Sequence, residues 1–238
     1  MNNKNITWLH TADLHLGQPV KGAFLSDPML ARQRMTDYLS TFERIIKMAQ
    51  LHSPSFLFIA GDFLEHGYVN DTLLNFIKDL FQAIPFTQIF IAPGNHDPYR
   101  LDSCYRWESW PTNVHIFQDK WETHHFGDLT ICGRGFSDFI EPKFIPPPDI
   151  LNKYKFMVVH GTFIKNHETT DYFPLPAPLL TTLNYNYIAA GHIHKQDACR
   201  LKNSCRTLFN YPGSPEALNW KELGSRYITL GMLKNGLV

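Results

Sequence analysis

Residues 56–97 read FLFIAGDFLEHGYVNDTLLNFIKDLFQAIPFTQIFIAPGNHD, and this stretch gives the clearest indication of the fold. It contains two short apolar runs, Phe56–Ala60 and Gln88–Ala92, each stopped by glycine and polar residues. Between them, apolar residues recur at helical spacing, namely Leu73, Leu74, Ile77, Leu80, Phe81 and Ile84. A strand, a helix and a second strand in this order predict two parallel strands joined by a right-handed crossover.

The same pattern extends toward both ends of the chain. Ile6–His10 is another short apolar run that enters a polar loop. Asp27 and Pro28 then predict the start of a helix that covers one sheet face, with apolar positions at Met35, Leu39, Phe42, Ile45, Ile46 and Ala49. Downstream, short strands are expected at 114–117, 123–126, 129–132, 156–159 and 187–190, and the tail is expected to form hairpins with turns at Asn203-Ser204 and Asn235-Gly236.

Length and composition favour a single globular domain over residues 1–238. The chain is 44% hydrophobic and 18% charged, which is too apolar for a disordered protein. Its 22 basic side chains cancel its 22 acidic ones, so no global field attracts nucleic acid or an anionic membrane, and a polyanionic substrate must be held by local groups. The one basic run, Lys195, Arg200, Lys202 and Arg206, is interpreted as a solvated hairpin face.

Residues 1–8 contain no apolar stretch long enough for a signal peptide. The longest uncharged run, 172–191, contains three prolines and is therefore a poor candidate for a membrane helix. The four cysteines lack a C-x-x-C pair and are expected to be reduced thiols. These features predict a cytoplasmic protein that does not associate with membranes.

Five of the predicted strands end in short clusters of Asp, His and Asn. The clusters are Asp13-Leu14-His15, Gly61-Asp62, Gly94-Asn95-His96-Asp97, His160-Gly161 and Gly191-His192-Ile193-His194. A single pair of this kind carries little weight, because lone histidines are usually solvated or core residues. The carboxyl ends of parallel strands lie on one edge of an open sheet, so five clusters are expected to converge there and form a site.

The chemistry of these clusters points to two metal ions. Imidazole, carboxylate and amide ligands favour borderline divalent ions such as Mn, Fe or Zn over Ca, and there is no thiolate set for structural zinc. Seven ligands exceed the needs of one tetrahedral ion but suit two ions about 3.5–4 Å apart with one bridging carboxylate. Such a pair activates water and clamps phosphoryl oxygens during in-line displacement, so the site predicts phosphoester hydrolysis.

In order and spacing, the five motifs resemble the signature of the calcineurin-like metallophosphoesterase superfamily, D-x-H, GD-x-x-D, GNH-D/E, H and GH-x-H, over nearly the whole chain. The resemblance implies an α/β fold, a four-layer α-β-β-α sandwich of two mixed sheets flanked by helices. It assigns Asp13, His15, Asp62 and His194 to a first metal, and Asp62 as bridge, Asn95, His160 and His192 to a second. It makes His96 the catalytic histidine, which protonates the leaving oxygen or stabilises charge on the phosphoryl group.

Glu65 departs from the signature, which has aspartate at this position. We expect Glu65 to orient His96, because a carboxylate partner fixes the tautomer of an imidazole. Asp97 is either an alternative partner of His96 or a turn cap. His66 is either a contact to substrate phosphate or a surface histidine.

The flanks of the motifs resemble the SbcD-like and YhaO-like branch of DNA repair exonucleases. The resembling segments are Leu9–Gly17, Asn113–Phe117, Cys132–Phe136, His160–Thr162, Tyr187–Lys195 and Tyr211–Ser214. The resemblance implies Mn-dependent, 3′ to 5′ exonucleolytic cleavage of DNA, with an SMC-like ATPase as partner. Such nucleases typically continue into a capping domain and an ATPase-docking segment, which this sequence does not contain. A nuclease core and a compact phosphodiesterase both stay open.

The loop after His96 is a candidate substrate surface, because it interleaves aromatic residues with arginines, an arrangement that suits stacking on bases and pairing with phosphates. Packing of these aromatics against the core explains them equally well. The predicted substrate contacts are Tyr99, Arg100, His66 and Lys195. The main alternative function is a phosphomonoesterase or small-substrate phosphodiesterase acting on nucleotides or phosphoproteins. A non-catalytic scaffold is disfavoured by the complete ligand set, and the oligomeric state, a homodimer included, stays open.

Overall fold

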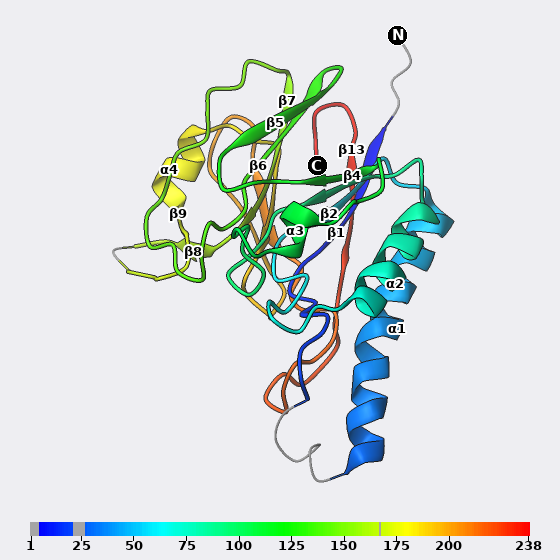
Figure 1. Ribbon diagram of the computed structural model, residues 1–238. Coiled ribbons are helices and arrows are strands. Elements are labelled where there is room, and N and C mark those ends of the chain that lie inside the picture. Colours follow the sequence, from blue (N-terminus) through cyan, green and yellow to red (C-terminus); the bar gives the residue numbers. More distant parts are fainter. Residues whose placement is uncertain (1–4, 21–26, 167) are drawn as a thin grey trace.

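Two β-sheets face each other between helices (Figure 1). The computed structural model describes residues 5–20, 27–166 and 168–238. Of residues 1–8, which were searched for a signal peptide, the first four therefore lie outside the described residues. The first sheet has the order β13-β1-β2-β3-β4, with β1 Ile6–Thr11, β2 Phe56–Ile59, β3 Gln88–Ile91, β4 Val114–Ile116 and β13 Thr229–Leu233. The second has the order β11-β12-β10-β7-β6-β5, with β5 Glu122–Phe126, β6 Leu129–Gly133, β7 Tyr154–His160, β10 Tyr187–Gly191, β11 Asp197–Arg200 and β12 Leu208–Tyr211.

Both sheets are mixed. In the first, β1, β2, β3 and β4 are parallel neighbours, as the alternation of strands and helices predicts. In the second, β6, β7, β10 and β12 are parallel, and β5 and β11 are antiparallel edge strands. The turn predicted at Asn203-Ser204 joins β11 to β12.

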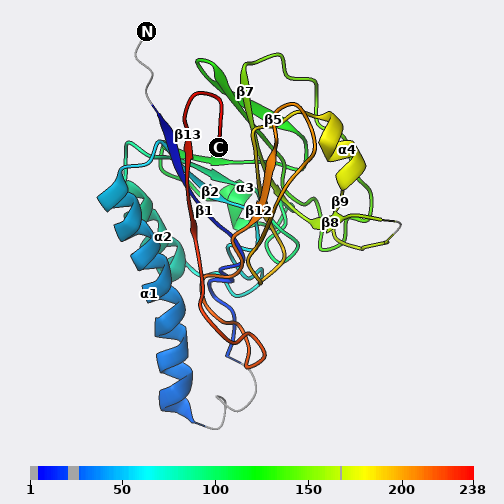
Figure 2. The same cartoon turned by 180° about the vertical axis from the view of Figure 1, so that it is seen from behind.

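The prediction of hairpins throughout the tail is wrong for β13. This strand pairs antiparallel with β1, more than 200 positions earlier in the chain, and so completes the first sheet (Figure 2). The turn at Asn235-Gly236 closes only a single bridge between Lys234 and Leu237. An open strand edge presents unpaired backbone N–H and C=O groups. The free edge of β1 offers β13 more of these groups than the short segment after the turn does.

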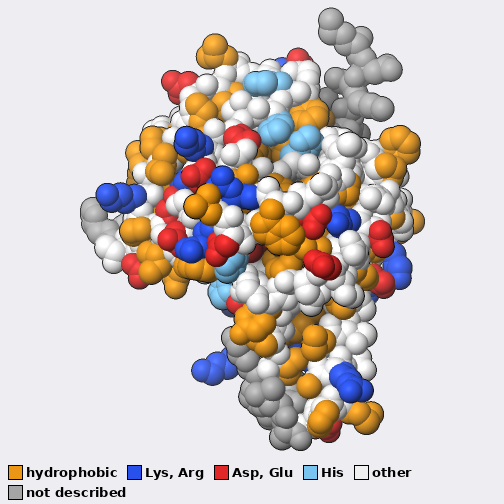
Figure 3. Space-filling view, in the orientation of Figure 1, with side chains coloured by type: hydrophobic (Ala, Val, Ile, Leu, Met, Phe, Trp, Pro, Cys, Tyr) orange, Lys and Arg blue, Asp and Glu red, His pale blue; other side chains and the backbone are white. Residues whose placement is uncertain are grey.

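Helices α1 (Pro28–His52) and α2 (Asp71–Gln82) cover the outer face of the first sheet (Figure 1). Asp27 caps α1 by accepting the N–H groups of Met29 and Leu30, and Asn70 caps α2 through Leu73. The C-terminal half of α1 buries its apolar face, whereas its N-terminal part extends past the sheets and leaves Met29 exposed, beside other apolar side chains on this extension (Figure 3).

The fourth layer is thin. The outer face of the second sheet is covered by the short helix α4 (Ala177–Thr182), by irregular segments and by a small two-stranded sheet of β8 (Thr162–Ile164) and β9 (Pro174–Pro176). Another short helix, α3 (Cys104–Trp107), lies in the loop after β3. The architecture is therefore the α-β-β-α sandwich with two mixed sheets. No helix among the described residues combines the length and apolar character needed to cross a membrane.

The interface between the sheets is aromatic and contains one buried polar network. Trp8 packs with Phe58, Phe156 and Tyr187, with ring centroids 4.6–6.5 Å apart. Beside them the fully buried His10 accepts at Nδ1 from Tyr187 Oη at 2.8 Å and from the Asn210 amide at 3.2 Å. This network fixes β1 against β10 and β12 and thereby sets the relation between the two strand ends that carry Asp13 and His192.

Candidate metal centre

The ligand clusters come together from both sheets. Asp13, Asp62 and Asn95 follow β1, β2 and β3 of the first sheet, whereas His160 ends β7 and His192 follows β10 of the second. The expectation of a single sheet edge is therefore corrected, because the two facing sheets each bring strand ends to the same place. The sheets approach closely there, since a Cβ on Gly191 would lie 1.8 Å from the carbonyl oxygen of Ala60.

Asp62 lies at the centre of the cluster. Its Oδ1 accepts the backbone N–H of His96 at 2.8 Å. Its Oδ2 lies 3.7 Å from His15 Nε2 and 3.4 Å from His160 Nε2, so one oxygen faces ligands on two sides. Burial raises the pKa of this carboxyl, but the neighbouring His160 and His15 outweigh burial and hold the pKa well below its usual range.

Two groups of three side chains flank this oxygen. In the first, ligand atoms of Asp13, His15 and His194 all lie within 4.8 Å of one another. In the second, the same holds for Asp62, His160 and His192, and Asn95 Oδ1 lies 3.1 Å from His160 Nε2. The structure therefore brings together all seven residues predicted as ligands: Asp13, His15, Asp62, Asn95, His160, His192 and His194.

Hydrogen bonds at Nδ1 aim the Nε2 atoms into the cluster. His15 donates from Nδ1 to Glu65 at 3.1 Å, and His160 donates from Nδ1 to the carbonyl oxygen of Ala60 at 2.9 Å. Carboxylate and carbonyl oxygens only accept, so these bonds assign the proton to Nδ1 and leave Nε2 free as a ligand. A third histidine, His194, shows the same pattern.

The donor set fits divalent cations. His15 Nε2 is buried and has no hydrogen-bond partner among the described residues. His160 Nε2 faces the acceptor oxygens of Asn95 and Asp62, and although burial lowers the pKa of His160, Asp62 outweighs it and raises the pKa to about 9. The oxygens of Asp62 and Asn95 thus draw positive charge to this point, a charge that a divalent cation would supply, and Mn, Fe and Zn match these imidazole and carboxylate ligands.

The backbone around the cluster is strained. Asp13, His15, Asp62 and His192 have φ angles of 55°, 48°, 48° and 110°, in the left-handed region that side-chain-bearing residues rarely adopt. Such residues persist only where the surrounding structure holds them, and they concentrate at functional sites. The strained positions include four of the seven ligands, all within four residues of a strand end.

His96 borders the cluster on its solvent side. Its ring centroid lies 4.6 Å from that of His15, and its side chain is 42% exposed, whereas the ligands of the first sheet are buried. Glu65 Oε1 lies 3.1 Å from His96 Nδ1, and this hydrogen bond raises the pKa of His96. Burial raises the pKa of Glu65, but hydrogen bonds from His15 and His96 outweigh it and lower the pKa to about 2.

Asp97 caps the loops that follow β2 and β3. Among the described residues, no hydrogen bond joins its carboxylate to the His96 ring. Its carboxylate accepts the N–H groups of Asp62, Phe63, Leu64 and Gly94 at 2.7–3.1 Å. The Tyr105 hydroxyl donates to it at 2.6 Å. Of the two interpretations left open for Asp97, the turn cap is the one that the structure supports.

The predicted substrate contacts do not form one surface. Arg100 pairs with Asp102 and Asp138, and His66 lies 3.4 Å from the same Asp102. Tyr99 packs against the hydrophobic core between the first sheet and helices α1 and α2. The Arg106 guanidinium lies 5.1 Å from the centroid of its ring. Lys195 is exposed and lines a pocket of about 380 Å³ that His194 also lines. The basic run after it lies on the β11 hairpin, where Arg200 donates to backbone carbonyls.

Two residues near the cluster were not predicted. Glu222 Oε1 lies 3.0 Å from His194 Nδ1 and comes from the irregular segment between β12 and β13. The Tyr172 ring lies 4.8 Å from the His192 ring. Neither residue belongs to a motif, and each is about 20 or more positions from its partner. No local signal in the sequence indicates these contacts.

The chain belongs to the calcineurin-like phosphoesterase family, whose model matches residues 6–196. Membership identifies it as a metal-dependent phosphoesterase, a hydrolase. It is 26% identical over 246 residues to the metallophosphoesterase YhaO of Bacillus subtilis (strain 168), and the match covers 98% of this chain and 58% of that protein. The chain therefore spans less than two thirds of the length of this distant relative.

The fold also occurs in a solved structure. The crystal structure of TT1561 of Thermus thermophilus is similar with a TM-score of 0.54 and 13% sequence identity, over 89% of this chain and 90% of that chain. YfcE, a phosphoesterase from E. coli, matches with a TM-score of 0.43 and 16% identity, over 97% of this chain and 89% of that chain. The first likeness places the two mixed sheets in the metallophosphoesterase fold.

Proposed function

We propose that this chain hydrolyses phosphodiester bonds with two divalent metal ions, with Mn as the preferred metal. We further propose that its substrate is DNA, which it degrades as a repair exonuclease. The observation that carries the two-metal part is the position of Asp62 Oδ2, which faces His15 on one side and His160 on the other. Asp13 and His194 would complete the first metal position, and Asn95 and His192 the second.

When bound, the two ions supply an activated water and neutralise charge on the phosphoryl oxygens. The protein supplies the geometry and a proton. His96 holds Nδ1 against Glu65, which leaves Nε2 to donate a proton to the leaving oxygen. The hydrogen bond to Glu65 stabilises the protonated ring and fixes its orientation, so His96 is the proposed acid and Glu65 the proposed orienting group.

The choice of DNA rests on the sequences that flank the motifs, which resemble the SbcD-like and YhaO-like branch. The same resemblance supports an SMC-like ATPase as partner, which would be tested by whether such an ATPase stimulates cleavage when ATP is added. A compact phosphodiester or phosphomonoester is the second candidate substrate. The balance of 22 basic and 22 acidic side chains favours it, because binding of duplex DNA gains much of its affinity from neutralised phosphates.

One experiment separates these substrates. The protein is incubated with Mn²⁺ and end-labelled linear duplex DNA, and in parallel with a bis-aryl phosphodiester and the matching aryl monoester, with His96→Ala as the control. Stepwise loss of nucleotides that needs both Mn²⁺ and His96 supports the exonuclease. Cleavage of the bis-aryl diester with intact DNA supports the compact substrate, and preference for the monoester contradicts the nuclease proposal.

A further inference from the structure

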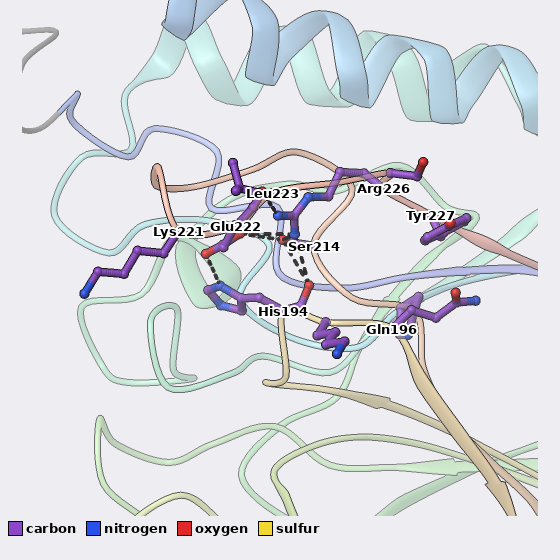
Figure 4. A pocket seen from close by; sticks show the side chains of 11 residues that line it. His194, Gln196, Ser214, Lys221, Glu222, Leu223, Arg226 and Tyr227 are labelled. Atoms are coloured by element: carbon purple, nitrogen blue, oxygen red, sulfur yellow. Dashed lines mark hydrogen bonds and ion pairs between the residues drawn. The ribbon is translucent and has the colours of Figure 1, made fainter.

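The segment between β12 and β13, residues 212–228, places a carboxylate behind one proposed metal ligand. Glu222 Oε1 lies 3.0 Å from His194 Nδ1. Figure 4 marks this contact with a dashed line. The opposite ring nitrogen, Nε2, faces Asp13 Oδ1 at 4.0 Å. The ring of His194 thus has one nitrogen on the carboxylate and the other directed into the cluster.

Glu222 is itself held in place by several donors. Its Oε2 accepts from Ser214 Oγ and from the backbone N–H of Leu218, both at 3.2 Å, and the Asn219 amide donates to Oε1 at 2.6 Å. The Arg226 guanidinium pairs with Oε2 at 3.2 Å. A carboxylate with these fixed partners has little freedom to move away from His194.

Arg226 connects the two residues a second time. Its Nη1 donates to the backbone oxygen of His194 at 3.2 Å and to Ser214 Oγ at 3.0 Å, and its Nη2 donates to the backbone oxygen of Glu222. The same guanidinium therefore holds the backbone of the histidine and the backbone of the carboxylate residue. The dashed lines in Figure 4 show this arrangement beside Ser214.

The arrangement parallels that of two other histidine ligands. His15 and His160 also engage Nδ1, with Glu65 and with the Ala60 carbonyl, while Nε2 points into the cluster. A carboxylate that accepts from one ring nitrogen fixes the tautomer and makes the other nitrogen a stronger metal ligand. Glu222 stands in this relation to His194 although it lies 28 residues further along, outside every motif.

We propose that Glu222 is a positioning residue that sets the tautomer and orientation of His194 and thereby strengthens metal binding at the position formed by Asp13, His15 and His194. The inference rests on the proposed two-metal function. It predicts an effect on one metal position only. Among the described residues, no hydrogen bond joins Glu222 to the ligands of the other position, His160, His192 and Asn95.

The test is a stepwise Mn²⁺ titration of the metal-stripped full chain, with free Mn²⁺ measured by electron paramagnetic resonance. The wild type should bind two ions. In Glu222→Ala, the Kd of one ion should rise between about tenfold and about a hundredfold, and the other should stay unchanged. Glu222→Gln, which keeps the shape and one acceptor oxygen, should show a smaller rise at the same position.

Glu216→Gln is the matched control. Glu216 lies in the same segment and accepts from Arg34 at 2.7 Å and from Thr41 at 3.0 Å, so the change loosens the segment without touching His194. Neither Kd should move in this variant. Equal weakening of both ions in the Glu222 variants, together with a lower melting temperature without metal, would assign Glu222 a merely structural role and overturn the inference.

The same titration separates this inference from the proposed function. Two bound ions in the wild type with unchanged affinities in both Glu222 variants would overturn the role of Glu222 and leave the two-metal proposal intact. Fewer than two bound ions in the wild type would overturn the two-metal proposal and, with it, this inference.

Discussion

Glu65 Oε1 lies 3.1 Å from Nδ1 of His96. The second oxygen of the same carboxylate lies 3.1 Å from Nδ1 of His15, so one side chain contacts both the proposed acid and a proposed metal ligand. The longer side chain of glutamate, where the family signature has aspartate, is compatible with this double contact. The metal site and the proton donor are therefore oriented by a common group.

Removal of Glu65 should impair both functions. In Glu65→Ala, kcat on a bis-aryl phosphodiester at saturating Mn²⁺ should fall, because His96 loses the partner that fixes its ring, and Mn²⁺ affinity should fall about tenfold to a hundredfold. Steady-state kinetics and a Mn²⁺ titration measure the two effects. Asp102→Ala, which removes a carboxylate beside His66, is the control. An unchanged kcat in Glu65→Ala would contradict the orienting role.

His96→Ala should lose turnover and keep its metals. Loss of a general acid costs about 10²- to 10⁴-fold in rate. The two ligand groups around Asp62 do not include His96, which lies instead in a third group with His15 and Glu65 and engages Glu65 through Nδ1. Metal analysis of the purified variant together with its kcat tests both halves. His66→Ala serves as the matched histidine control and should retain most activity. Loss of bound metal from His96→Ala would show that His96 is a ligand.

Asp62→Ala should remove both metals together. Its Oδ2 faces ligands of both positions, so neither position keeps its bridge when the carboxylate is absent. Asp138→Ala, at an exposed carboxylate that pairs with Arg100, provides the comparison. Metal content after dialysis gives the answer, and one tightly retained ion in Asp62→Ala would show that the bridging assignment is wrong.

The buried His10 should make the fold sensitive to acid. Burial lowers the pKa of His10 to about 3, below its ordinary value of 6.5, so the unfolded chain binds the proton more readily. The contribution of His10 to the free energy of unfolding is complete above pH 6.5 and is lost as the pH falls toward 3, by about 1.4 kcal/mol per pH unit. A charged His10 would also lose the acceptor that Tyr187 and Asn210 use.

Urea unfolding of metal-free protein between pH 7.5 and pH 4.5 measures this effect. His10→Gln is expected to be less stable than the wild type at pH 7.5, and the difference should shrink as the pH falls. His52→Gln, at an exposed position near the end of α1, should follow the wild type throughout. Parallel curves for His10→Gln and the wild type would mean that His10 does not titrate differently on unfolding.

The sequence predicted those parts of the molecule that depend on local patterns. The parallel strands β1, β2 and β3 with their helices follow from apolar runs and helical spacing, and the seven metal-ligand candidates follow from polar clusters at strand ends. The pairing of β13 with β1 could not be predicted, because it depends on which sheet edge is free after the chain has folded. Apolar runs predicted most strands of the second sheet, but their assembly into a separate sheet was expected only from the family resemblance.

The residues that orient the metal ligands and His96 were harder to predict from the sequence. Glu65 lies within a motif, so its contact with His96 could be expected, whereas its contact with His15 depends on how β1 and β2 are aligned. Glu222 contacts His194 only because an irregular segment returns past the cluster. Arg100, a predicted substrate contact, pairs with Asp138, 38 residues away in a proline-rich loop whose irregular sequence gives no sign of this contact.

The most direct test of the two-metal claim is anomalous X-ray scattering at the manganese edge from crystals grown with Mn²⁺. The account predicts two peaks about 3.5–4 Å apart, with the Asp62 carboxylate between them and His96 bound to neither. A single peak, or peaks that do not share Asp62, would contradict it.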